Sequence, residues 1–344
     1  MTVHAYTSFS FSYLNRASVL AKTLARQHPD WVIWAVITDK EPPGYSFDPA
    51  ACGFHRVVYA EELYGAETDS WLFGHDIVEA CTAVKGHALL HILEDETAEK
   101  VFYFDPDMAV FNSMQPVADL LGAHSIVLTP HQTVPDGADE TRAILDNEIT
   151  SLDYGVFNLG FIAVNNDAEG RSFAQWWADR LYRWCHDRRE IGLFVDQKWC
   201  NLIPCFFDRY KVLRDPGCNV ASWNLSQRTI SFDSEGTALV NGAPLRFYHF
   251  TKLGAVGDMM TQRYGADNIE VYEIWNWYRN FVEAETDPAI PKGWWYYGQF
   301  DNGVEIPKPL RVLFRSRNDL RQYFKYPRQV DNGFYNWLEA NGHV

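Results

Sequence analysis

Val101-Phe-Tyr-Phe-Asp105-Pro-Asp107 is the stretch of this 344-residue chain that says most about its fold. The β-branched and aromatic residues at 100–104 predict a buried strand, because such side chains suit a pleated, packed surface. Asp105-Pro-Asp107 ends the strand, since proline has no N–H to donate to a neighbouring strand. In open α/β sheets, ligands bind at the carboxyl ends of the strands. The stretch therefore predicts an α/β protein with two carboxylates at a ligand-binding edge.

The residues before and after this stretch predict the rest of the sheet. Residues 3–6 and 31–38 are expected strands, and residues 15–27 between them have apolar side chains at helical spacing. Strand–helix–strand is the start of a parallel sheet with a crossover helix. Further strands are expected at 56–59, 125–129, 156–164, 211–213 and 245–250, and further helices at 77–93, 172–185 and 196–202.

The composition is that of a globular protein with an acidic surface. Hydrophobic residues make up 47% of the chain, which is enough to bury one large core. A formal net charge of -15 repels phosphate backbones and argues against nucleic acid as a partner. A divalent cation can still join carboxylates to a nucleotide. The six cysteines are scattered without a Cys-x-x-Cys pair, so we expect free thiols rather than a disulfide scaffold or a zinc site.

The ends of the chain suggest a location and a domain division. The first residues lack the basic and apolar segments of a secretory signal. No stretch approaches about 18 uninterrupted apolar residues, so we expect no transmembrane segment and a cytoplasmic protein. After about residue 265 the pattern becomes aromatic and weakly periodic. We therefore predict a main domain at 1–264 and an aromatic-rich C-terminal extension at 265–344, whose aromatic run at 294–297 leaves peripheral contact with the inner face of a membrane open.

Six motifs follow one another along the chain: Tyr13, Lys85, Asp105-x-Asp107, Phe-Asn-Leu-Gly at 157–160, Asp-Gln at 196–197 and His-Phe-Thr-Lys at 249–252. This ordered set resembles the GT-A glycosyltransferases, in particular glycosyltransferase family 8, over roughly residues 3–255. The resemblance implies a Rossmann-like, nucleotide-binding GT-A domain at 1–264. It also implies transfer of a sugar from a nucleotide-sugar, with a UDP-sugar favoured, to an acceptor hydroxyl with retention of configuration. The acceptor would be a glycan or a lipid-linked saccharide, as in surface polysaccharide assembly.

The resemblance assigns a metal site and a phosphate site. Asp105 and Asp107 match the family's metal-binding aspartates, and His249 matches its third protein ligand. Two carboxylates and an imidazole suit Mn²⁺, with Mg²⁺ as the alternative. Lys252 would hold the diphosphate as a point charge.

The resemblance also assigns residues to the nucleoside and to the donor sugar. Those that would seat the nucleoside are Ser8, Phe9, Tyr13 and Asp39. Those that would lie beside the donor sugar are Asn158, Gly160, Asp196 and Gln197. Lys85 matches a basic residue that the family carries on the preceding helix, and it is expected to help bind the donor. Asp196 and Gln197 would be the catalytic pair near the reacting carbon, with Gln197 in a positioning or cation-stabilising role because an amide is a poor nucleophile.

Two other functions remain open on the sequence. A non-catalytic carbohydrate-binding or scaffold protein would use Asp105-Pro-Asp107 only as a turn, since proline and aspartate favour turns, and would use its tryptophans to stack on sugars. A sugar nucleotidyltransferase would also use an α/β domain and magnesium. Such enzymes usually have a glycine-rich loop after the first strand, and residues 7–13 contain no glycine. Metal-dependent binding of a nucleoside diphosphate distinguishes an enzyme from a pure sugar binder.

Overall fold

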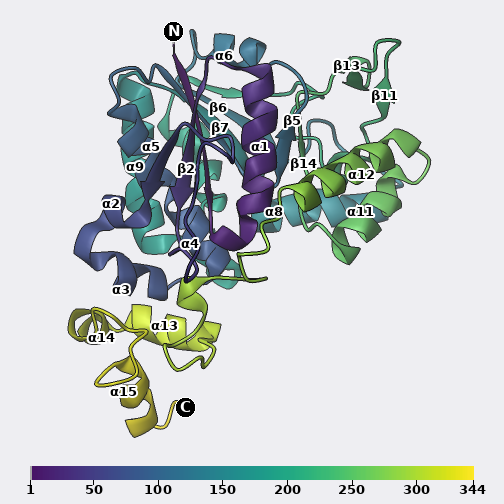
Figure 1. Cartoon of the computed structure of the whole chain (residues 1–344). Helices are drawn as coiled ribbons and strands as arrows, with labels where there is room; N and C mark the ends of the chain where they lie inside the picture. The colour runs from purple at the N-terminus through teal and green to yellow at the C-terminus, as the bar shows by residue number, and fades with distance from the viewer. Residues whose placement is uncertain (1) are drawn as a thin grey trace.

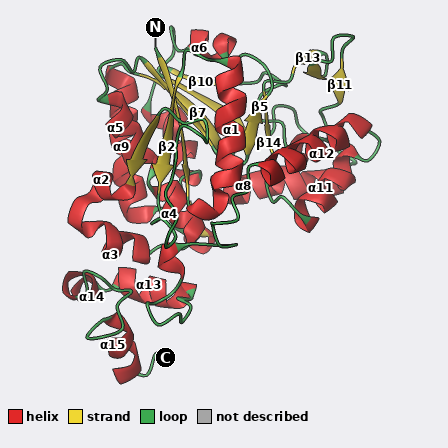
Figure 2. Cartoon of the chain, viewed as in Figure 1, coloured by secondary structure: helices red, strands yellow, loops and turns green. Residues whose placement is uncertain are grey.

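The computed structural model describes residues 2–344 and is built around one seven-stranded sheet (Figures 1 and 2). The strands of this sheet are β1 (Val3–Phe9), β2 (Val32–Ile37), β3 (Arg56–Tyr59), β4 (Lys100–Phe104), β6 (Ile126–Pro130), β7 (Phe157–Asn165) and β10 (Tyr210–Val212). Their order is β10-β6-β7-β4-β1-β2-β3. β7 runs antiparallel to both its neighbours, and the other pairs in the sheet are parallel. The predicted α/β fold with a mostly parallel sheet is confirmed.

Helices cover both faces of this sheet. The helices of the first two thirds of the chain are α1 (Leu14–Gln27), α2 (Ala60–Tyr64), α3 (Thr68–Phe73), α4 (Ile77–Ala83), α5 (Lys85–Leu93), α6 (Gln115–Leu120), α7 (Thr141–Ala143), α8 (Thr150–Tyr154), α9 (Ala168–Trp184) and α10 (Ile203–Phe206). Alternate residues of β1 face opposite sides, so Ala5 packs in the cluster that contains Leu20 of α1, and Tyr6 in the cluster that contains Trp177 of α9. Both faces are therefore buried, which explains why the strands are apolar throughout rather than alternating.

The smaller strands connect distant parts of the chain. They are β5 (Met108–Val110), β8 (Asp187–Arg188), β9 (Leu193–Phe194), β11 (Ile230–Phe232), β12 (Ala238–Val240), β13 (Ala243–Pro244) and β14 (Phe247–His249). β14 pairs antiparallel with β5, in a register that sets His249 opposite Met108. This pairing brings the late histidine beside the Asp105-Pro-Asp107 turn.

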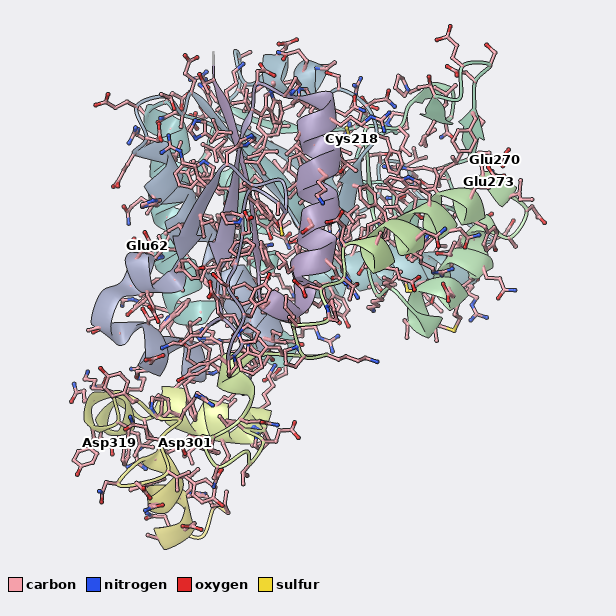
Figure 3. The ribbon with its side chains drawn as sticks, in the orientation of Figure 1. Glu62, Cys218, Glu270, Glu273, Asp301 and Asp319 are labelled. Carbon is pink, nitrogen blue, oxygen red and sulfur yellow. The ribbon has the colours of Figure 1, made fainter. Side chains whose placement is uncertain are left out.

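The region after residue 264 is more regular than its sequence pattern indicated. It contains α12 (Ile269–Ala284), α13 (Lys308–Ser316), α14 (Asn318–Tyr323) and α15 (Phe334–Ala340), preceded by α11 (Ala255–Gly265). α12 buries Trp275 and Tyr278 against Phe250, whose ring stacks on Tyr278 with centroids 3.8 Å apart. The later helices form a separate lobe, in which Figure 3 labels Asp301 and Asp319, far from Glu270 and Glu273 on α12. The sequence pattern therefore understated the helical content of this extension. Its helices bury aromatic side chains, which are not strong helix formers.

Two other expected helices differ in detail. The helix expected at 77–93 is divided into α4 and α5 at Val84. Next to the division, Gly86 packs so closely on α9 that an added Cβ would lie 2.5 Å from the Cα of Ala178. The helix expected at 196–202 is a 3₁₀ turn, Lys198–Leu202. The six cysteines are free. Among residues 2–344, no helix has both the length and the apolar character needed to cross a bilayer.

Candidate active site

A cavity of about 440 Å³ opens at the carboxyl ends of β1 and β4. Because β7 runs antiparallel to β4, its first residues reach the same edge of the sheet. The expected site residues that line the cavity are Ser8, Phe9, Tyr13, Lys85, Asp105, Asp107, Asn158, Gly160, Asp196, Gln197, His249 and Lys252. The fold thus gathers segments that are more than 240 residues apart in sequence around one space.

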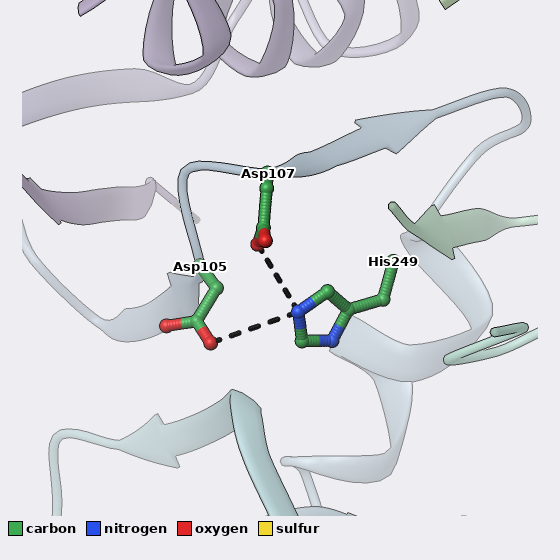
Figure 4. A group of neighbouring side chains, drawn as sticks. All are labelled: Asp105, Asp107 and His249. Atoms are coloured by element: carbon green, nitrogen blue, oxygen red, sulfur yellow. Dashed lines mark ion pairs between the residues drawn. The ribbon is translucent and has the colours of Figure 1, made fainter. Parts of the chain in front are cut away.

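Asp105, Asp107 and His249 form a compact group of potential metal ligands at this edge (Figure 4). One ligand atom from each lies within 4.8 Å of the others. His249 Nε2 is 3.1 Å from Asp107 Oδ1 and 3.9 Å from Asp105 Oδ2. Two carboxylates and one imidazole are donors that Mn²⁺ and Mg²⁺ accept, so the residues present fit a divalent cation.

The charges of this group support one another. Burial disfavours the imidazolium, but Asp107 and Asp105 outweigh it and raise the pKa of His249. Burial likewise disfavours the carboxylate, but His249 outweighs it and lowers the pKa of Asp107. His249 Nδ1 lies 3.3 Å from Asn158 Oδ1. When Nε2 is unprotonated, Nδ1–H can donate to Asn158 and the Nε2 lone pair is free for a cation, the arrangement that metal-binding histidines use.

Gly160 on β7 leaves the space in which His249 sits. A Cβ at this position would lie 2.6 Å from Met108 Cε, 2.7 Å from His249 Cε1 and 2.8 Å from Asn158 Oδ1. All three distances are shorter than a van der Waals contact, so a larger residue would displace the histidine ring. The glycine is therefore required by close packing.

Lys85 is a buried cation that fixes two of the carboxylates. Its side chain is 2% exposed, and Nζ donates to Asp105 Oδ1 at 3.0 Å, to Asp196 Oδ2 at 2.8 Å and to the carbonyl of Leu159 at 3.0 Å. Burial opposes the charge, but the two carboxylates outweigh it and raise the pKa of Lys85. Burial raises the pKa of Asp196 to about 6, although Lys85 acts in the opposite direction.

Tyr103 on β4 orients Asp105 together with Lys85. Its hydroxyl donates to Asp105 Oδ1 at 2.6 Å, the same oxygen that Lys85 contacts. Asp105 Oδ2 is the oxygen that faces His249. Asp105 Oδ1 is thus held by Lys85 and Tyr103, and Asp105 Oδ2 is directed at His249. Sequence reasoning missed Tyr103, although its place two residues before Asp105 on a strand puts both side chains on one face.

Gln197 is buried and is held by the first residues of β7 and the last residue of α8. Its Oε1 accepts from Asn158 Nδ2 and from the backbone N–H of Leu159, each at 3.3 Å. Its Nε2 donates to the carbonyl of Tyr154 at 3.1 Å. Gln197 is therefore rigidly placed in the cavity wall between Asp196 and Asn158.

The other end of the cavity is more open. Tyr13 is 37% exposed, and the guanidinium of Arg16, which sequence reasoning missed, lies 4.2 Å from the centre of its ring. Asp39 does not line the cavity, which departs from the expected contact with the nucleoside. Its carboxylate accepts from the backbone N–H groups of Phe11, Lys40 and Tyr296 at 3.2, 2.9 and 2.7 Å. Asp39 therefore supports the cavity wall from behind, and burial raises its pKa to about 7 despite these bonds.

Comparisons with known proteins give distant similarities. No protein-family model matches the chain. It is 27% identical over 177 residues to YfnF, an uncharacterized protein of Bacillus subtilis; the match covers 51% of this chain and 57% of YfnF. In structure it is similar to the galactosyltransferase LgtC in complex with donor and acceptor sugar analogues (TM-score 0.49, 15% identity, 86% of this chain and 99% of LgtC). It is also similar to the glycosyltransferase GlyE of Streptococcus pneumoniae (TM-score 0.45, 15% identity, 82% of this chain and 62% of GlyE).

Proposed function

We propose that this chain is a metal-dependent glycosyltransferase that moves a sugar from a nucleotide-sugar to an acceptor hydroxyl. The observation that supports this most is the position of the Asp105, Asp107 and His249 group beside the buried Lys85–Asp196 pair in one cavity. Asp105, Asp107 and Asp196 lie here with Lys85 and His249, and Lys252 also lines the cavity. Two carboxylates and an imidazole can hold a divalent cation, and the cation would join them to the diphosphate of a nucleotide-sugar.

In this proposal the chain binds the donor along the cavity. Tyr13 stacks on the base, with a UDP-sugar favoured, and Lys252 contacts the diphosphate. Asp105, Asp107 and His249 would hold Mn²⁺ or Mg²⁺, which neutralises charge on the departing diphosphate when it is bound. Lys85 keeps the carboxylates of Asp105 and Asp196 in place, so the site does not have to reorganise during the reaction.

In the transfer, the bond from the anomeric carbon to the diphosphate oxygen breaks and a bond to the acceptor oxygen forms. The proton of the acceptor hydroxyl passes to the departing diphosphate oxygen, and the nucleoside diphosphate is released. The transition state has oxocarbenium character, with positive charge near the anomeric carbon. Asp196 and the amide oxygen of Gln197 are the groups on this side of the cavity that stabilise such charge. We propose retention of configuration, which NMR of the product anomer tests; an inverted product contradicts it. We propose a glycan or a lipid-linked saccharide as acceptor.

A thermal-shift experiment tests the proposed function. UDP, GDP and ADP are added to the full chain with and without MnCl₂. A ligand that binds only the folded state raises the unfolding midpoint. We expect a shift with one nucleotide that requires Mn²⁺ and is absent in Asp107→Asn.

Asp153→Asn is the matched control, because the Asp153 side chain on α8 is 45% exposed and does not line the cavity, so the shift should be unchanged. A chain that shows no shift with any nucleotide is not a nucleotide-sugar enzyme. That result would favour the carbohydrate-binding alternative, with Asp105-Pro-Asp107 reduced to a turn.

A further inference from the structure

Trp223 lines the same cavity but has no place in the donor site described above. It lies on a 3₁₀ turn, Ser222–Asn224. Its ring centroid is 5.2 Å from that of His249 and 5.5 Å from that of His131, in an edge-on arrangement with each. The indole Nε1 is buried and has no hydrogen-bond partner in the protein. A buried N–H without an acceptor is unfavourable, and a ligand oxygen would satisfy it.

The turn that presents Trp223 is fixed by its neighbours. The Asn224 side chain accepts from the backbone N–H of Ala221 at 3.0 Å. Its Nδ2 donates to the carbonyls of Asn219 at 2.9 Å and His131 at 3.2 Å. The position of the indole is therefore built into the fold and tied to His131.

The groups around Trp223 are polar but mostly uncharged. Asn158 Nδ2 is 3.4 Å from His131 Nε2 and 3.3 Å from Gln197 Oε1. His131 does not itself line the cavity, but Asn158 and Trp223, which lie against it, do. Burial lowers the pKa of His131 to about 4, so it is neutral at pH 7. This part of the cavity offers an aromatic ring with neutral donors and acceptors, whereas the part around Lys85 offers paired charges.

We propose that Trp223 is the platform on which an acceptor pyranose stacks, with its indole N–H donating to a sugar oxygen. This inference rests on the proposed glycosyltransferase function and adds the residue that receives the acceptor sugar. A pyranose has an apolar face that packs on an aromatic ring and hydroxyls that bond to amide, imidazole and indole groups. An acyl chain would leave the Trp223 N–H unpaired. The donor's diphosphate belongs at the charged part of the cavity and its sugar beside Asn158 and Gln197, which leaves the indole for the second sugar.

The test separates transfer to a sugar from transfer to water. The full chain is incubated with MnCl₂ and UDP-glucose or UDP-galactose, alone and with the methyl pyranosides of glucose, galactose and N-acetylglucosamine. Hydrolysis and glycoside formation are measured separately. In Trp223→Ala, we expect the ratio of transfer to hydrolysis to fall at least tenfold and the KM for the methyl pyranoside to rise. Trp223→Phe keeps an aromatic ring without the N–H. Its ratio of transfer to hydrolysis should lie between those of the wild type and Trp223→Ala.

Trp184→Ala is the matched control, because Trp184 is 50% exposed at the end of α9 and should keep the wild-type ratio. Equal losses of transfer and hydrolysis in Trp223→Ala overturn the inference, because they show a general structural role. Hydrolysis by the wild type without transfer to any methyl pyranoside overturns the inference and leaves the proposed function standing. A wild type that neither binds UDP with Mn²⁺ nor cleaves either donor overturns the proposed function as well.

Discussion

Two ion-pair networks of the chain differ in charge balance. The Lys85 group, which consists of Lys85, Asp105 and Asp196, lies in the cavity. The Glu79 group, which consists of Glu79, Asp76, Arg315 and Lys308, lies between α4 and α13. Glu79 on α4 is bound by Arg315 at 2.6 Å and Lys308 at 3.1 Å, both on α13. Its Oε1 also accepts from the backbone N–H of Asp187. Lys308 also contacts Asp76 at 2.8 Å, so two carboxylates face these two cations. Lys85 instead shares its one charge between two carboxylates and lies next to a third.

We interpret this difference as that between a structural network and one that a ligand completes. Buried charges are costly unless they are paired, so a balanced network can serve only to hold elements together. Carboxylates around a cavity can instead be completed by a bound cation. The Glu79 group joins α4 to α13, and in the proposed function the Lys85 group lies beside a cation. The following predictions test that contrast, beginning with the largest effect.

Asp107→Asn should remove most of the turnover and little of the stability. The variant keeps the shape of the side chain but loses a charged ligand, so we expect a rate reduction of about 10²–10³-fold, the scale of losing a charge-stabilising group. Release of nucleoside diphosphate from the nucleotide-sugar measures the rate, and urea denaturation measures the stability. Near-normal turnover would place the active site elsewhere.

Glu79→Gln should lose stability and keep ligand binding, which is the opposite of the result expected for Asp107→Asn. It leaves Arg315 buried without its carboxylate, so the free energy of unfolding should fall by about 3 kcal/mol, as for other broken buried pairs. Binding of UDP with Mn²⁺ by the folded protein should persist. Urea denaturation and calorimetric titration make the two measurements, with the exposed Glu305→Gln as control. Loss of binding without loss of stability would show that the two networks are not separate.

Gly160→Ala tests the space around His249. The added methyl group displaces the imidazole or Asn158, so the affinity for Mn²⁺ should fall by about 10–100-fold, the usual effect of disturbing groups that orient a metal ligand. Titration of Mn²⁺ in the presence of UDP measures it. Gly192→Ala is the control for the loss of a glycine away from the site: it has open space around it, although its left-handed φ of 85° adds some backbone strain. Equal affinity for Mn²⁺ in Gly160→Ala and Gly192→Ala would contradict the proposal that Gly160 leaves the space for His249.

The smallest effect expected is on stability in mild acid. Arg315 and Lys308 outweigh the burial of Glu79 and lower its pKa from 4.5 to about 2. A lowered pKa in the folded state means that the stabilisation is complete above pH 4.5 and is lost as the pH falls through about 2. The advantage of the wild type over Glu79→Gln should therefore change little between pH 7 and 5 and shrink below pH 4.5. Urea denaturation at pH 7, 4 and 2.5 tests this; a constant difference down to pH 2.5 contradicts it.

The sheet and the first two candidate metal ligands, Asp105 and Asp107, can be predicted from local sequence patterns. The apolar runs of β1, β2 and β4 are long enough to predict buried parallel strands, and the position of Asp105 at a strand end follows from that. The metal group needs more, because His249 reaches Asp107 through the pairing of β14 with β5, which are far apart in sequence. Spacing alone does not predict such a pairing, and only the family resemblance pointed to it.

The roles of residues that are set by tertiary contacts could not be predicted from the sequence. Asp39 follows β2 as a nucleoside ligand would, but its carboxylate is taken up by backbone groups, one of them from Tyr296. The helices after residue 264 have helical spacing of their buried residues, as at Val271, Trp275 and Tyr278, yet aromatic residues have modest helix propensity. Trp223 was one of 13 tryptophans, and no local pattern sets it apart from the others.

The bond between Tyr296 N–H and Asp39 also affects how the chain matures on the ribosome. The two residues are 257 positions apart. At translation speeds of about 5–20 residues per second, Tyr296 is made roughly 13–50 s after Asp39. During that interval the nascent sheet holds a carboxylate whose third backbone donor does not yet exist. The wall behind the Tyr13 end of the cavity is therefore completed late, and the newly made chain should gain ligand affinity only after most of its C-terminal region has emerged.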